Sequence, residues 1–229
     1  MIDNELSLLK VLGKGGSSKV FLANDSTNNK YAVKVIHKDK GFVAESAAAM
    51  MEREHTLIQK LDEHPNIIKS YKINLEGTVT SGEESESIMY SVLEYAKHGA
   101  LSYFVRHTGG IEEQISRLFA LQICNAIEHI HSQGCAHLDI KLENVLLDEY
   151  FNIKIADMGS SADVQGTNGF INRKRGTLLY MAPEVANLQA GQEYDAMAAD
   201  IYSLGVTLYL MMVGEFPTNN KSSNNFYTI

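Results

Sequence analysis

The first ninety residues alternate short apolar runs with polar breaks, a pattern that is typical of strands. The runs "LSLLKVLGKGGSSKVFLAND" and "KYAVKVIHK" are rich in Val, Leu and Tyr, and two more strands are expected over Ile68–Asn74 and Ser87–Glu94. Residues 43–61 contain no Gly or Pro, which predicts one helix. The acidic stretch "LEGTVTSGEESE" between the last two strands is expected to be a solvated hairpin tip.

After "AKHGA" the apolar positions follow helical spacing instead. The run "IEEQISRLFALQICNAIEHIHSQG" predicts a helix that ends at a glycine, and a second apolar helix follows Met197. Its run "IYSLGVTLYLMMVG" is too short to span a bilayer and follows Asp200 directly, so a buried helix is expected. This order predicts an α+β fold, with a small β-rich lobe over residues 1–95 and a larger, mainly helical lobe over 96–229.

Composition narrows the class of protein. The 229 residues are 45% hydrophobic and 21% charged, which is ordinary for a globular domain. A net charge of −8 argues against a general nucleic-acid binder, whose affinity depends on cations that neutralise phosphates. Cys124 and Cys135 do not make a disulfide framework, and no signal-peptide pattern opens the chain. We therefore expect a cytoplasmic protein, with the nucleus as the alternative, and neither a nucleic acid nor a membrane as a partner.

A glycine-rich turn is the first candidate for chemistry. "GKGGSSKV" at 13–20 lies between two strand-like runs, where glycines let backbone N–H groups approach a phosphate. A plain glycine hairpin is the commoner explanation of such a turn alone. The turn does not end in the Gly-Lys-Ser/Thr sequence of a P-loop. A strand rather than a helix follows the turn, which argues against a dinucleotide-binding motif. Lys34 lies in the next strand and Glu54 in the predicted helix, and either alone would be an ordinary surface residue.

Later motifs add polar groups in a fixed order. "HLDIKLEN" at 137–144 places Asp139 and Asn144 in one short loop, and "IKIADMG" places Asp157 at a strand end. Carboxylate and amide oxygens suit Mg²⁺, and a further carboxylate can orient a hydroxyl. "GTLLYMAPE" at 176–184 and "DIYSLG" at 200–205 follow. Each fragment alone is ambiguous, but five of them in one order and at compatible spacing are not a coincidence.

Together these motifs resemble those of a eukaryotic protein kinase domain of the serine/threonine type, over essentially the whole chain. The resemblance implies the bilobal protein kinase fold and transfer of the γ-phosphate of ATP to a protein hydroxyl, with Mg²⁺ or Mn²⁺ as the metal. It assigns Asp139 as the catalytic base and Asn144 and Asp157 as metal ligands. It also assigns Lys34 to the α- and β-phosphates, with Glu54 as its partner.

The same resemblance implies the substrate class and the nucleotide site. Lys141, two residues after the catalytic Asp, is typical of serine/threonine members and would reach the γ-phosphate, so the expected partner is a protein with a Ser or Thr acceptor. The remaining residues assigned to ATP are Leu12, Gly13, Lys14, Gly15, Gly16, Ser17, Ser18, Lys19 and Val20 in the turn, Ala32 and Leu146 beside the adenine, Leu93 as gatekeeper, and Glu94 and Ala96 at the hinge.

Some positions depart from the family's pattern. Leu138 stands where an arginine usually binds a phosphate on the activation loop, so that switch is expected to be missing. Met158 replaces a Phe and is expected to pack as an apolar residue, and Ser18 and Ala100 also depart. These changes leave open a nucleotide-binding pseudokinase, a scaffold or an inactive fragment. The candidate phosphate acceptors are Ser160, Ser161, Thr167 and Thr177, and Arg173, Lys174 and Arg175 are expected to form a solvated basic stretch.

Two further expectations concern the helix that contains Asp200. The resemblance implies that Asp200 accepts hydrogen bonds from the 137–139 turn, with a helix N-cap role as the alternative. Glu184 usually pairs with an arginine in a later helix, and the tail after Gly214 contains none. The helical lobe is therefore expected to be truncated, with an apolar patch beside Met211 and Met212 that favours self-association.

Overall fold

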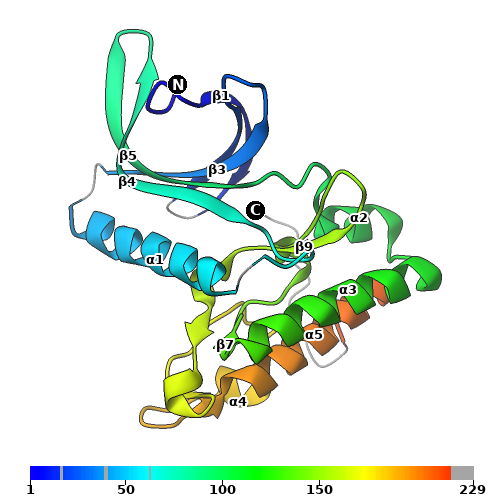
Figure 1. Ribbon diagram of the computed structural model, residues 1–229. Coiled ribbons are helices and arrows are strands. Elements are labelled where there is room, and N and C mark those ends of the chain that lie inside the picture. Colours follow the sequence, from blue (N-terminus) through cyan, green and yellow to red (C-terminus); the bar gives the residue numbers. More distant parts are fainter. Residues whose placement is uncertain (16–17, 39–40, 62, 218–229) are drawn as a thin grey trace. The chain divides into compact units, whose positions relative to one another are not determined.

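The computed structural model describes residues 1–15, 18–38, 41–61 and 63–217, without the side chains of residues 41–46. The chain divides into two compact units (Figure 1). Unit 1 consists of Met1–Glu63 and Ile68–Ala96, and unit 2 consists of His64–Ile67 and Lys97–Ile229.

Unit 1 is a five-stranded antiparallel sheet with one helix, in the strand order β1-β2-β3-β5-β4. Helix α1 packs on the sheet through Ala47 and Met51, which contact Ile36 and Met89 in an apolar cluster. The elements are β1 (Ser7–Lys14), β2 (Lys19–Asn24), β3 (Lys30–His37), α1 (Gly41–Lys60), β4 (Ser70–Ser81) and β5 (Glu84–Glu94).

The hairpin of β4 and β5 is longer than the sequence predicted. The stretch 75–86 was expected to be a solvated tip, but both strands run through it and leave only Gly82 and Glu83 in the turn. The hairpin is present and residues 81–87 are exposed, as expected, but the strands pair with each other up to Ser81 and Glu84, so the turn is shorter than predicted. Asp3 adds hydrogen bonds to this hairpin. Asp3 accepts hydrogen bonds from the Thr78 amide (2.7 Å) and the Tyr90 hydroxyl (2.8 Å). Such contacts leave no periodic signal in the sequence.

Unit 2 combines helices with short strands, and α3 and α5 contact each other (Figure 1). Its helices are α2 (Leu101–Thr108), α3 (Glu113–Ser132), α4 (Pro183–Ala186) and α5 (Ala196–Val213), with 3₁₀ turns at Leu142–Asn144, Met158–Ser160 and Gln165–Thr167. Strands β6 (Gly99–Ala100), β8 (Val145–Leu147) and β9 (Ile153–Ile155) form one sheet. Two further pairs are β7 (Cys135–Ala136) with β10 (Ala162–Asp163), and β11 (Phe170–Ile171) with β12 (Tyr194–Asp195).

Helix α5 is the apolar helix expected near the end of the chain. The helix is long and apolar enough to cross a membrane by length and composition alone, and 44% of that window is buried inside the structure. Its N-cap is Asp195, which accepts hydrogen bonds from the amides of Met197 and Ala198. Met212 is 49% exposed, as expected, whereas Met211 is only 1% exposed. The expectation of an exposed patch is therefore wrong for Met211.

Candidate functional site

Lys34 and Glu54 form an ion pair within unit 1. Strand β3 carries the lysine and helix α1 carries the glutamate, and Lys34 Nζ lies 2.7 Å from Glu54 Oε2. The two side chains are 21% and 8% exposed. The pairing expected from the sequence is present, and the limited contact with water strengthens this charge-assisted hydrogen bond.

The glycine-rich turn connects β1 to β2. The Gly15 amide donates to the Ser18 carbonyl over 2.8 Å, which closes the described part of the turn, while Gly16 and Ser17 lie outside the described residues. A Cβ at Gly13 would meet nothing within 4 Å. Packing among the described residues therefore gives no reason for a glycine at that position.

The other residues predicted to contact ATP divide between the two units. In unit 1, Ala32 on β3 lies directly opposite Leu93 on β5, and Glu94 and Ala96 follow at the end of β5 and beyond it. Leu146 lies on β8 of unit 2.

Asp200 fixes the backbone at the start of the loop that contains Asp139, inside unit 2. It is 1% exposed, and its two oxygens accept hydrogen bonds from the amides of His137 and Leu138, each over 2.7 Å. His131 Nε2 lies 2.9 Å from the same carboxylate. The predicted tether is confirmed, and the N-cap alternative is wrong because Asp195 fills that place.

His137 and Leu138 then orient the loop at Asp139. The Asp139 amide donates to Nδ1 of the buried His137 over 3.2 Å, and His137 Nε2 lies 3.2 Å from the Ala156 carbonyl oxygen. Leu138 has a left-handed backbone with φ of 64°. For a residue with a Cβ this conformation costs about 1–2 kcal/mol. The Asp200 tether compensates for that cost, since it holds the amides of both residues.

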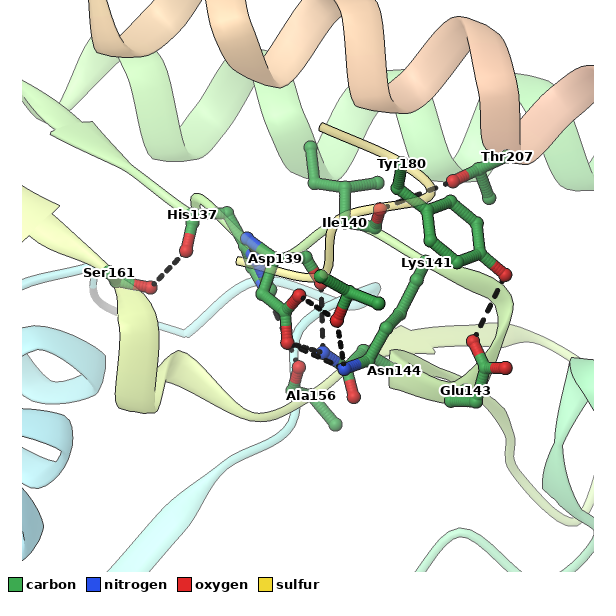
Figure 2. Close-up of polar contacts among 11 residues, drawn as sticks. His137, Asp139, Ile140, Lys141, Glu143, Asn144, Ala156, Ser161, Tyr180 and Thr207 are labelled. Carbon is green, nitrogen blue, oxygen red and sulfur yellow. Dashed lines mark hydrogen bonds and ion pairs between the residues drawn. The ribbon is translucent and has the colours of Figure 1, made fainter. Parts of the chain in front are cut away.

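The Asp139 carboxylate is the centre of a polar network (Figure 2). Lys141 Nζ lies 2.7 Å from Oδ2, and the Thr177 hydroxyl donates to Oδ1 over 2.7 Å. Lys141 also donates to the Thr177 hydroxyl over 2.8 Å. Asn144 donates from Nδ2 to the Asp139 carbonyl over 2.9 Å. Figure 2 shows Lys141 and Asn144 directed toward Asp139.

This network sets the protonation state of Asp139. Burial alone raises the pKa of the carboxyl, but the hydrogen bonds from Lys141 and Thr177, with the charge of Lys141, outweigh burial and hold the pKa below its ordinary value. The group is therefore an anion at neutral pH. It is oriented to accept a hydrogen bond from a hydroxyl brought close to it.

Asn144 and Asp157 were predicted as metal ligands. Asn144 is 7% exposed, and its amide nitrogen is engaged by Asp139, which leaves the side-chain oxygen as its donor to a cation. Asp157 is exposed and has a left-handed backbone with φ of 65°, directly before the buried Met158. Among the described residues, no three or more His, Cys, Asp or Glu side chains are grouped to hold a metal. One amide and one carboxylate oxygen fit Mg²⁺, which takes few protein ligands and completes its shell with phosphate and water.

Two predicted phosphate acceptors have other places in the structure. Ser161 is fully buried and donates to the His137 carbonyl over 3.1 Å, so its assignment as an accessible acceptor is wrong. Thr177 bonds to both Asp139 and Lys141, a role that the sequence reasoning missed. The available signal was its position in "GTLLYMAPE".

The fold is that of a protein kinase domain. The chain belongs to the family described as protein kinase domain, whose model matches residues 6–229. It is 34% identical over 230 residues to CBL-interacting protein kinase 2 of Oryza sativa subsp. japonica, covering 99% of this chain and 48% of the relative. It is also 34% identical over 234 residues to serine/threonine-protein kinase cds1 of Schizosaccharomyces pombe, covering 97% and 48%. The chain thus spans about half the length of the curated relatives that it matches.

Proposed function

We propose that this chain is a Mg-ATP-dependent kinase that phosphorylates serine or threonine hydroxyls of a protein substrate. The observation that carries the proposal is the carboxylate of Asp139, kept ionised and oriented by Lys141 and Thr177. The Lys34–Glu54 ion pair and the membership of the family support it.

In the proposed reaction the substrate hydroxyl oxygen attacks the γ-phosphorus of ATP. The bond from that phosphorus to the β–γ bridging oxygen breaks, ADP leaves, and the hydroxyl proton passes to Asp139. Lys141 lies 2.7 Å from Asp139, so its ammonium is placed to offset charge on the transferred group. Lys34, held by Glu54, binds the α- and β-phosphates. A magnesium ion held by Asn144 and Asp157 would supply further charge neutralisation.

The central test is Asp139→Asn, which keeps the shape of the side chain and removes the proton acceptor. We expect nucleotide binding, measured by calorimetry, to persist while transfer from Mg-ATP to a generic basic protein falls by about 10²- to 10⁴-fold. Glu149→Gln, which neutralises an exposed carboxylate after β8, is the matched control. Transfer by Asp139→Asn at the wild-type rate would show that the catalytic assignment is wrong. A wild type that binds nucleotide without transfer would favour the scaffold alternative.

A further inference from the structure

Arg175 connects the later half of the segment that runs from Met158 to Ala186 to the start of that segment. Its Nη1 donates to the carbonyl of Ser160 over 2.9 Å and to that of Ser161 over 2.8 Å. The sequence predicted a solvated basic stretch here, and for Arg175 this is wrong, because its guanidinium is directed to backbone carbonyls of the same segment. Charge-assisted hydrogen bonds of this kind are stronger than neutral ones.

The residues after Arg175 lie directly on the catalytic loop. Gly176 has φ of 97°, and a Cβ at this position would clash with the carbonyl oxygen of Leu138. Thr177 bonds to Asp139. Arg175 and Thr177 are two residues apart, so the contact at Ser160 and Ser161 limits the positions that the Thr177 hydroxyl can take beside the Asp139 carboxylate.

The side chain at position 138 adds an apolar contact to the same segment. Leu138 is 7% exposed and belongs to a cluster that includes Val164 near the start of the segment and Val185 at its end. Arg175, Leu138 and Tyr194 also line one small cavity in unit 2. Burial raises the pKa of Tyr194 to about 12, against the effect of the nearby Arg175 charge, so this phenol stays neutral.

We propose that Arg175 is a positioning residue that, with Leu138, holds the segment 158–186 in order without a phosphate group on it. A phosphate orders such a segment by recruiting a cation. Here a cation of the segment itself is already bound to backbone carbonyls, and the catalytic loop offers an apolar side chain at the contact. The catalytic consequence of this proposal rests on the proposed kinase function, but the order of the segment does not.

The test compares phosphatase-treated wild type with Arg175→Met, which keeps the length of the side chain and removes its donors, and with Arg175→Lys. Hydrogen exchange without nucleotide reports on the order of the segment. We expect its amides to exchange about tenfold faster in Arg175→Met, with an intermediate rate in Arg175→Lys, whose ammonium keeps the charge and some donors. Arg173→Gln, at an exposed arginine two residues earlier, should leave this exchange unchanged.

Kinetics separate positioning from plain destabilisation. Arg175→Met should lower kcat about tenfold and leave the KM for ATP unchanged, because the displaced group lies beside Asp139. A segment that becomes protected only after phosphorylation would overturn the proposal, as would wild-type exchange in Arg175→Met. A wild type that transfers no phosphate, but whose segment is protected in an Arg175-dependent way, would refute the proposed function and support the positioning role.

Discussion

Lys34 in unit 1 and Asp139 in unit 2 are both held by oppositely charged side chains, but the elements that carry them differ. Lys34 projects from β3, whose neighbours on both sides fix its backbone, and its partner projects from a long helix. Asp139 lies in an irregular loop, where side-chain hydrogen bonds from other segments replace the strand ladder. A regular sheet positions a residue through its backbone, whereas a loop needs buried polar tethers. The two sites should therefore respond differently when a partner is removed.

The largest effect is expected at Asp200, the tether of the loop. Asp200→Ala leaves the amides of His137 and Leu138 buried without their acceptor, and each unsatisfied group costs about 1–3 kcal/mol. We expect the free energy of unfolding of unit 2 to fall by about 3 kcal/mol. Urea unfolding followed by circular dichroism, with hydrogen exchange to report on unit 2 separately, measures this loss.

Asp195→Ala is the matched control, because the Asp195 side chain caps the same helix and, in the described structure, accepts only from the amides of Met197 and Ala198. Loss of an N-cap costs about 1 kcal/mol. If the two variants lost the same stability, the carboxylate of Asp200 would be no more than a second helix cap, and the distinction between a sheet-held and a tether-held site would fail.

Glu54 tests the other side of the comparison. Glu54→Gln removes the charge that orients Lys34 but keeps a side-chain oxygen as a hydrogen-bond acceptor and leaves β3 in its sheet, so we expect unit 1 to lose about 1 kcal/mol of stability, less than unit 2 loses in Asp200→Ala. Transfer should still fall about tenfold, since a freely moving lysine no longer binds the phosphates in one geometry.

The control for this variant is Glu52→Gln, which changes an exposed glutamate one half-turn away on α1. It should retain both stability and transfer rate, measured by urea unfolding and by steady-state kinetics. A loss of stability in Glu54→Gln as large as that of Asp200→Ala would mean that unit 1 also depends on a tether, contrary to the comparison.

The residues that the sequence placed correctly are those whose position follows from local pattern. The helix expected over 43–61 runs from Gly41 to Lys60, because its start and end depend on nearby residues. Met158 is buried as expected from an apolar swap. The Asp200 tether was accessible only through resemblance to a family, since 62 residues separate it from Leu138.

The features that the sequence did not reveal depend on partners that are distant in the chain. The contact between Thr78 and Asp3 joins residues that are 75 positions apart, and no alternation of apolar residues in the sequence indicates it. From the sequence, Arg175 was expected to be one of three solvated cations, and only the structure reveals the backbone carbonyls to which it donates. Thr177 was likewise expected only as a possible phosphate acceptor, and the structure shows that its hydroxyl donates to Asp139.

The smallest expected effect is a difference between the two units in how their stability depends on pH. In unit 1, burial raises the pKa of Asp3, but hydrogen bonds led by the Thr78 amide outweigh burial and keep the pKa below 3.8. In unit 2, the ring of His64 stacks on that of His129 with 4.8 Å between centroids. Burial, with the charges of His129 and Lys154, lowers the pKa of His64 from 6.5.

Both groups bind fewer protons in the folded state than in the unfolded state, so each stabilises its unit above its ordinary pKa and loses that effect as pH falls. The pH ranges over which this stabilisation is lost differ: unit 2 should begin to weaken below pH 6.5, whereas the Asp3 contribution to unit 1 should last down to pH 3.8.

Hydrogen exchange and urea unfolding between about pH 7.5 and about pH 5 measure the difference. His64→Gln should remove this part of the pH dependence of unit 2, and His107→Gln, at an exposed histidine on α2, should not. An equal weakening of both units over that range would show that the stacked pair does not set the acid response.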